Sequence, residues 1–424
     1  MVFEYRKNGV LNLNCRFALV AMLIAVSMSV AAQVSTGIES LRNNGFAQLQ
    51  GKRIGLITNP TGVDSQLNST ADILASAPGV EIVAFFAPEH GIRGDIAAGN
   101  KVSNAVDSRT GIKVHSLYGK TRKPTAAMLA GIDALVYDIQ DNGCRSYTFI
   151  STMGKAMEAA AENGIEFIVL DRPNPLGGLR VEGLITEDDC VSFVSQFPIP
   201  YIYGMTAGEL AMFLKGERLI AGAENLTLTV VEMDGWERDM TFGDTLLPWV
   251  PTSPNIPTAE TCFFYPATGI VGELNFLSIG IGFTLPFKTF AAPWIDGVEL
   301  AERLNKRNIA GFRFRPISYK PTAATFSGSN VGGVEVFLTN PSEAVLTLLQ
   351  FYVLEELHKM YPEREPFAAT EGNTQRLRMF DLVTGSKSVR SEFKKSGYRT
   401  ESIVPLWNSD VESFKIQRQK YLIY

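Results

Sequence analysis

Cysteine, histidine and blocks of like charge are scarce in this chain of 424 residues. Four cysteines are too few for a disulfide scaffold, and three histidines leave little for a histidine-rich metal site. The 39 basic and 44 acidic residues give a net charge of −5 and form no block of either sign. Nucleic-acid binders normally carry a basic face, so no nucleic-acid partner is expected. With 46% apolar residues the chain can bury a sizeable core, which excludes a disordered protein.

The apolar run at residues 17–32 is too short for a membrane-spanning helix, which needs about 20 apolar residues. Arg6, Lys7 and Arg16 precede the run, and it ends in small residues that suit signal peptidase. We therefore predict that residues 1–32 are a signal peptide and that the protein is exported to the periplasm. No stable membrane insertion is expected after removal of the peptide. The alternative is a retained N-terminal anchor.

Short apolar runs alternate with helical patterns between residues 51 and 233. The runs have the length of buried strands, and the alternation predicts an α/β domain with a mostly parallel sheet over residues 37–250. Thr206 and Glu209 have the spacing of a capping box at the start of a helix. The predicted strands are Arg53–Thr58, Glu81–Ala87, Lys113–Leu117, Ala134–Asp138, Phe167–Leu170 and Leu226–Val231.

The composition changes after about residue 247. Four prolines lie within residues 248–257, and the Gly-rich and aromatic stretch at 263–294 predicts loop and short strand. Helical patterns return at 346–361 and in the tail from residue 388. We predict a smaller α+β auxiliary domain over residues 251–424.

Polar clusters follow four of the predicted strands. In open α/β sheets, ligands bind outside the carboxyl ends of the strands, so these clusters should converge on one site. They begin at Asn59, Pro88, Asp138 and Asp171. The residues expected there are Glu89, His90, Arg93, Asp138, Asp141, Arg145, Tyr147, Asp171, Arg172 and Asn174.

Each cluster also has a structural explanation. An aspartate that closes a strand often caps a helix, which is an equal alternative for Asp141 and Asp171. Arg93, Arg145 and Arg172 have the alternative of pairing with neighbouring acids. Asn59 and Asn174 precede prolines, and this pair of residue types commonly shapes turns.

The chain has no GxGxxG, GxxxxGK[ST], GxSxG or HExxH motif, so the common dinucleotide, nucleotide, serine-hydrolase and zinc-protease sites are not indicated. The remaining candidate chemistry is catalysis by carboxyl groups. Two carboxyl groups can hydrolyse a glycosidic bond, one as acid and one as base or nucleophile. Glu89 is the candidate acid, because the apolar residues before it suit a carboxyl group that must stay protonated. Its partner is left open among Asp138, Asp141, Glu182 and Glu273.

Five ordered motifs, at residues 88–94, 138–148, 171–178, 204–211 and 253–258, resemble those of the NamZ-type exo-β-N-acetylmuramidases. The resemblance covers essentially the whole chain after residue 37. It implies a Rossmann-like domain followed by an auxiliary domain, and release of N-acetylmuramic acid from the non-reducing end of peptidoglycan fragments. We expect no cofactor.

The resemblance also implies roles for individual residues. Glu89 lies in the family's PEHG motif and is carried over as the acid/base, and the arginines would bind the lactyl carboxylate. The second catalytic group stays open among Tyr147, Asp138 and Glu182. The substrate-binding residues are expected to be His90, Arg93, Asp141, Arg145, Asp171, Arg172, Asn174, Asn255 and Glu273.

Two positions depart from the family pattern. Tyr203 stands where relatives often carry histidine, and Ile281 lies in a Gly-Ile-Gly segment where many relatives carry arginine. These departures bear on specificity more than on the reaction.

Two other functions remain open at this stage. One is a metal-dependent hydrolase in which Glu89, His90, Asp138 and Asp141 bind a divalent ion. The other is a non-catalytic periplasmic protein that binds peptidoglycan-derived saccharides.

Overall fold

A computed structural model describes residues 33–89, 91–93, 105–119, 121–367 and 374–424. The predicted signal peptide and His90 lie outside the described residues. Val34–Tyr424 form one compact unit. Within the described ranges, no helix combines the length and the apolar character needed to cross a membrane. The predicted domain boundary at residue 250 stays a prediction.

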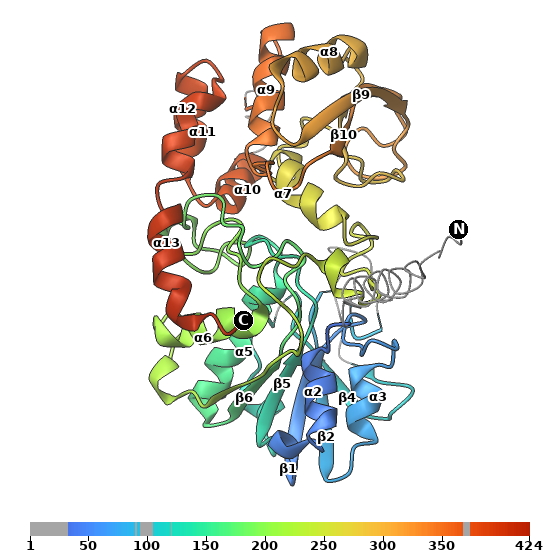
Figure 1. Ribbon diagram of the computed structural model, residues 1–424, viewed down its shortest axis with the longest axis vertical. Helices are drawn as coiled ribbons and strands as arrows, with labels where there is room; N and C mark the ends of the chain where they lie inside the picture. The colour runs from blue at the N-terminus through green and yellow to red at the C-terminus, as the bar shows by residue number, and fades with distance from the viewer. Residues whose placement is uncertain (1–32, 90, 94–104, 120, 368–373) are drawn as a thin grey trace, which may run out of the picture. The chain divides into compact units, whose positions relative to one another are not determined.

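A seven-stranded sheet occupies the first part of this unit (Figure 1). Its strand order is β3-β4-β2-β1-β5-β6-β7, and every pairing is parallel except that of β3 with β4. This confirms the predicted α/β class. The strands are β1 Lys52–Thr58, β2 Val80–Ala87, β3 Ala105–Val106, β4 Lys113–Ser116, β5 Ala134–Asp138, β6 Glu166–Leu170 and β7 Leu228–Val231.

The strand order reverses between β1 and β5. From β1 the chain moves outward to β2 and β4, and it then returns to place β5 on the other side of β1. The carboxyl ends of β1 and β5 therefore flank the switch point, where open α/β sheets bind ligands.

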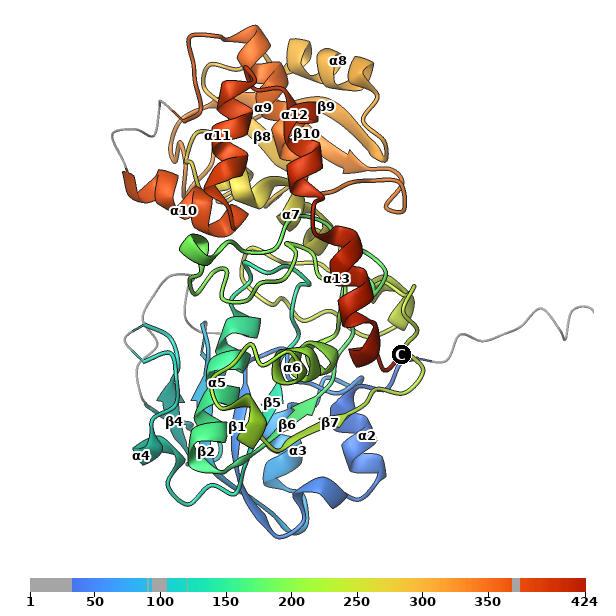
Figure 2. The ribbon, with the colours of Figure 1, turned by 90° about the vertical axis from the view of Figure 1, so that its left-hand side faces the viewer.

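Helices cover both faces of the sheet (Figures 1 and 2). α2 contacts β6 and β7 and α3 contacts β1 and β2, whereas α5 and α6 pack on the opposite face. Burial on both faces explains why the strands are nearly continuous apolar runs. The helices of this part are α2 Gly37–Asn43, α3 Thr70–Ala75, α4 Ala126–Leu129, α5 Phe149–Asn163 and α6 Ala207–Gly216, with 3₁₀ turns at Ala47–Leu49, Asp188–Cys190, Ala223–Asn225 and Phe242–Thr245.

The predicted capping box at Thr206 is confirmed. Its hydroxyl accepts a hydrogen bond from Glu209 N, and Glu209 accepts one from Thr206 N. These contacts satisfy backbone donors that the first turn of α6 leaves without helical partners.

A three-stranded antiparallel sheet, in the order β8-β10-β9, forms the centre of the second part. Its strands are β8 Thr289–Ala292, β9 Phe312–Tyr319 and β10 Val331–Leu338. The helices of this part are α7 Thr261–Gly272, α8 Gly297–Arg307, α9 Leu349–Met360, α10 Thr374–Thr384, α11 Lys387–Lys395 and α12 Thr400–Trp407. The last helix, α13 Val411–Arg418, and the 3₁₀ turn at Gln419–Tyr421 pack instead on the first part, where Phe414 and Tyr421 contact Phe213 of α6.

The prediction of loop and short strand across residues 263–294 was wrong for its first part, which is helix α7 with Pro266 inside it. Proline removes a backbone donor and normally breaks a helix. Here the buried side chain of Gln350 donates to Pro266 O at 2.9 Å and accepts from Val271 N at 2.9 Å. A side chain from α9 thus satisfies polar groups of the interrupted helix.

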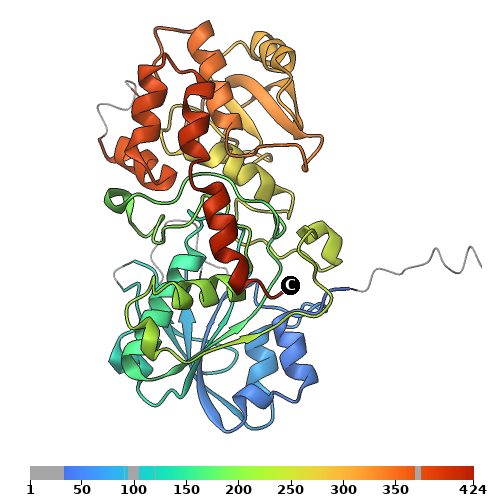
Figure 3. The ribbon, with the colours of Figure 1, turned by 60° about the vertical axis from the view of Figure 1, so that its left-hand side comes forward.

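The C-terminal segment returns to the seven-stranded sheet (Figure 3). Beyond α13, Ile423 N donates to the side chain of Glu209 at 3.0 Å, and the Tyr424 hydroxyl donates to Asp171 at 2.9 Å. Arg418 donates to the backbone oxygen of Tyr203 at 3.0 Å. The end of the chain therefore packs on the start of α6 and on the loops around it.

Candidate functional site

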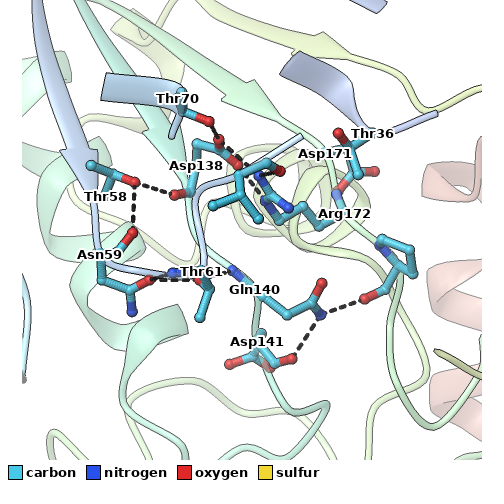
Figure 4. Close-up of polar contacts among 12 residues, drawn as sticks. Thr36, Thr58, Asn59, Thr61, Thr70, Asp138, Gln140, Asp141, Asp171 and Arg172 are labelled. Carbon is cyan, nitrogen blue, oxygen red and sulfur yellow. Dashed lines mark hydrogen bonds and ion pairs between the residues drawn. The ribbon is translucent and has the colours of Figure 1, made fainter. Parts of the chain in front are cut away.

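The loops after β1, β5 and β6 meet at the switch point (Figure 4). Thr61 accepts a hydrogen bond from Gln140 N at 2.9 Å and donates to Asn59 at 2.6 Å. Gln140 donates from its amide to Pro173 O at 2.7 Å. The polar groups at the switch point therefore bind one another and order the loops.

Asp138 forms a buried ion pair with Arg172. The guanidinium binds both carboxylate oxygens, one of them at 3.0 Å, and the Thr70 hydroxyl also donates to Asp138. Arg172 further donates to Val63 O at 2.7 Å. Removing one partner of such a pair typically costs about 3–5 kcal/mol, because the other charge stays buried. Both oxygens of Asp138 are engaged in holding the fold.

Asp171 is also buried and fully engaged. It accepts hydrogen bonds from Gly208 N at 2.8 Å, from Thr206 at 2.6 Å and from Tyr424. Burial raises its pKa to about 6 against the lowering effect of these donors. Gly208 lies in the first turn of α6, whose N-cap is Thr206, so Asp171 joins the end of β6 to the start of this helix without being its N-cap residue.

Asp141 occupies a different environment. One carboxylate oxygen accepts from Gly143 N at 2.8 Å and from the Tyr203 hydroxyl at 2.5 Å. The other oxygen is buried and has no hydrogen-bond partner among the described residues. Burial raises the pKa of this carboxyl group to about 6. Tyr203, one of the departures from the family pattern, therefore directly contacts a predicted site residue.

The predicted arginines are engaged inside the protein. The guanidinium of Arg145 is buried and donates to four backbone carbonyls and to Ser195, and burial lowers its pKa to about 10. Arg93 binds Asp107 through two hydrogen bonds of 3.0 Å. The Arg93 hydrogen bond is the largest of the effects that lower the pKa of Asp107 to about 2. Pairing with an acid thus applies to Arg93 and Arg172 but not to Arg145.

Two more candidates have their polar atoms occupied. Glu182 accepts from Thr347 N and the Thr347 hydroxyl, both at 2.9 Å, and from Arg180 at 2.6 Å. Asn174 donates to Met205 O and accepts from Leu176 N, as expected for a residue that shapes a turn.

Glu89 lies just beyond the carboxyl end of β2 and is half-buried. Gly91 N donates to Pro88 O at 3.2 Å, and Gly91 has a positive φ of 77°, which closes a tight turn around Glu89. Burial, followed by the charge of the nearby Glu89 carboxylate, raises the pKa of Tyr118 to about 12. Tyr118 was missed in the sequence, although it follows its strand as Glu89 follows β2.

A pocket of about 240 Å³ gathers the two remaining candidates, Asn255 and Glu273. Arg376 of α10 also lines it, and its guanidinium lies 3.7 Å from the Glu273 carboxylate. Burial raises the pKa of Glu273. Arg376 was not identified from the sequence, because nothing near it in the chain marks it as part of a site.

Tyrosines form one wall of this pocket. Ser146 hydrogen-bonds with Tyr201 at 2.8 Å and with Tyr265 at 3.1 Å, and both tyrosines line the pocket. Tyr147 packs edge-on against Tyr265 and donates to Thr252 at 2.8 Å. The loop after β5 therefore supports the pocket, with Tyr147 behind its wall.

Three of the four ligands named for the metal-dependent alternative, Glu89, Asp138 and Asp141, lie in the described part of the chain and do not form a metal-ligating group there. Within the described ranges, the grouping of metal-ligating side chains that could hold an ion consists of Glu187, Asp189 and Cys190. Asp189 is an ion-pair partner of Lys387. Glu89, Asp138 and Asp141 are not part of this grouping.

We expect Asp141→Asn to change how stability depends on pH. The pKa of Asp141 is about 6 in the folded protein and near 4 when unfolded, so the folded state holds more protons between these values. The unfolding free energy of wild type relative to Asp141→Asn should therefore fall as pH rises from 4 to 6, and stay level above. Urea titrations measure this difference.

Asp107→Asn is the matched control. The folded pKa of Asp107 is lowered to about 2, so its contribution is lost only as pH falls from about 4 toward 2. If the difference in unfolding free energy between wild type and Asp141→Asn stays constant from pH 4 to 6, the environment described for Asp141 is contradicted.

Comparisons with known proteins cover nearly the whole described chain. Residues 54–260 match the N-terminal family model of exo-beta-N-acetylmuramidase NamZ, and residues 263–424 match its C-terminal model. The peptidoglycan beta-N-acetylmuramidase NamZ of Bacillus subtilis (strain 168) is 46% identical over 394 residues, which cover 92% of each chain.

Two solved structures of DUF1343 family proteins from Bacteroides fragilis NCTC 9343 share the fold. One is 51% identical with a TM-score of 0.87, and the alignment covers 92% of this chain and 99% of that one. The other is 30% identical with a TM-score of 0.71, covering 93% and 99%. The chain belongs to the exo-beta-N-acetylmuramidase NamZ family.

Proposed function

We propose that this protein is an exo-acting glycoside hydrolase that releases N-acetylmuramic acid from the non-reducing end of peptidoglycan fragments. The observation that carries the proposal is its 46% identity to a peptidoglycan beta-N-acetylmuramidase across 92% of both chains. The comparisons give no support to the metal-dependent hydrolase or to the non-catalytic binding protein.

Glu89 is the acid/base in this proposal. A glycosidase acid must reach the glycosidic oxygen and give up a proton there. Asp138 and Glu182 are buried, and both oxygens of each accept hydrogen bonds from the protein. Glu89 is half-buried at the carboxyl edge of the sheet, where it combines access with partial shielding from water.

The pocket lined by Glu273 and Arg376 is proposed to hold the muramyl group. Tyr265 and Phe287 offer apolar ring surface, and Asn255 offers an amide. Arg376 takes the role expected of Arg93, Arg145 and Arg172. Its guanidinium lines the pocket, where it can form a charge-assisted hydrogen bond with a lactyl carboxylate.

We also propose that the protein is exported, because its proposed substrate lies outside the inner membrane. The signal peptide predicted for residues 1–32 supports this. N-terminal sequencing of the protein from a periplasmic extract should begin at Gln33. Recovery of the full-length chain in the membrane fraction would favour the anchor instead.

Glu89→Gln should lower the release of N-acetylmuramic acid from a MurNAc-GlcNAc disaccharide by about 10²–10⁴-fold, because the amide cannot donate the required proton. Glu81→Gln, an exposed change on the same strand, should keep wild-type activity. Chromatographic quantification of the free sugar measures both. Undiminished release by Glu89→Gln would remove Glu89 from the mechanism.

Arg376→Ala should weaken inhibition by free N-acetylmuramic acid by about tenfold or more, because a charge-assisted hydrogen bond to the carboxylate is lost. Inhibition by the methyl ester of the lactyl group should change little. Arg378→Ala is the matched control, since Arg378 lies on the same helix and donates to Asp189 O. Equal weakening for acid and ester would place the carboxylate elsewhere.

A further inference from the structure

Glu273 is the C-cap residue of α7 and lines the pocket that it shares with Arg376. Its side chain is 33% exposed, and the Arg376 guanidinium lies 3.7 Å from its carboxylate. Burial raises the pKa of Glu273, and the charge of Arg376 opposes this rise. No described residue donates a hydrogen bond to the carboxylate. Glu273 is therefore an acceptor that the fold leaves open in the pocket wall.

Glu217 shows how the fold completes a carboxylate at the same position of another helix. It is the C-cap residue of α6 and accepts hydrogen bonds from Tyr421 at 2.6 Å and Gln417 at 2.8 Å. Lys420 pairs with it at 2.7 Å, and Lys420, followed by Tyr421 and Gln417, lowers its pKa to about 2. A carboxylate at the C-terminus of a helix faces the negative end of the helix dipole, so it needs such partners. At Glu273 a ligand in the pocket can supply the missing donor.

The position of Glu273 beside Arg376 limits which group of the substrate it can meet. In the proposed function Arg376 binds the lactyl carboxylate, and the lactyl ether is attached to carbon 3 of the muramyl ring. The neighbouring ring carbons carry an acetamido N–H at carbon 2 and, at the non-reducing end, a hydroxyl at carbon 4. Both groups can donate a hydrogen bond to a carboxylate. Glu273 therefore lies within reach of one of these two donors.

We propose that Glu273 accepts a hydrogen bond from the 4-hydroxyl of the terminal muramyl group, an inference that rests on the function proposed above. An exo-acting enzyme must distinguish a chain end from an internal sugar, and the 4-hydroxyl is the group that differs between them. In an internal sugar this oxygen belongs to a glycosidic bond and has no proton to donate. Such a sugar would fill the pocket and leave the carboxylate without a donor, which a site built to bind a hydroxyl rejects strongly. Glu273 is thus a specificity-determining residue.

Two substrates and one variant test this role. The substrates are the MurNAc-GlcNAc disaccharide and its 4-deoxy form, which lacks only that hydroxyl of the muramyl group. In wild type, kcat/KM should be about 10–100-fold higher for the natural disaccharide, the range for one hydrogen bond to a charged group. In Glu273→Ala this ratio should fall below about threefold, because the acceptor is absent. The ratio is taken within one preparation, so it does not depend on the fraction of protein that folds.

Glu260→Ala is the matched control. Glu260 lies at the opposite end of α7, where its exposed carboxylate pairs with Lys288 at 2.6 Å. The ratio for the two substrates should keep its wild-type value in this variant. A third substrate, in which an ester oxygen replaces the acetamido N–H, measures the other donor. Its kcat/KM relative to the natural disaccharide should fall in Glu273→Ala by the same factor as in wild type.

The outcomes separate this inference from the proposed function. An unchanged 4-deoxy ratio in Glu273→Ala, or equal cleavage of both disaccharides by wild type, would overturn the role of Glu273 while the hydrolase function stands. A variant effect confined to the ester substrate would assign Glu273 to the acetamido group and overturn the role as well. No release of N-acetylmuramic acid from the natural disaccharide by wild type would overturn the proposed function and the inference with it.

Discussion

The buried guanidinium of Arg145 joins the parts of the protein on which the pocket depends. It donates to Leu184 O and Ile199 O, which follow β6 in the sequence, and to Thr384 O at the end of α10. A charge buried without a carboxylate is costly, and full hydrogen bonding offsets that cost. A side chain on Gly385 would collide with this guanidinium, so the approach of α10 requires glycine there.

The pocket lined by Glu273 and Arg376 lies next to the segments that Arg145 joins. Ser146 and Tyr147 follow Arg145 in the chain and bind the tyrosines of one pocket wall, whereas α10 supplies Arg376 from the other direction. Arg145 was expected to bind the substrate. It instead holds together the segments that carry the pocket residues, which bind the substrate in the proposed function. A residue of the correct type near a site can serve the site without touching its ligand.

The sequence predicts six of the seven strands of the large sheet, because strands such as β1 and β5 are buried on both faces and bounded by turn residues. It places Glu89 correctly at the end of β2 for the same reason. It misses β3, which has two residues, both exposed. It cannot reveal that Asp138 is bound by Arg172, 34 residues away, or that Gln350 donates a hydrogen bond to Pro266 O in α7. Those outcomes depend on contacts between distant segments, which local patterns do not encode. The proximity of Tyr118 to Glu89 follows from the register of β2 and β4, so it can be predicted only once that pairing is known.

The contact between Tyr424 and Asp171 joins residues 253 positions apart. Together with the bonds from Ile423 to Glu209 and from Arg418 to Tyr203, it makes the last residues part of the packing around α6. The seven-stranded sheet is therefore not complete without the C-terminal residues. A fragment that ends after β7 would expose the buried carboxyl group of Asp171 and the start of α6. Transfer of the seven-stranded sheet to another protein would therefore have to include the C-terminal residues as well.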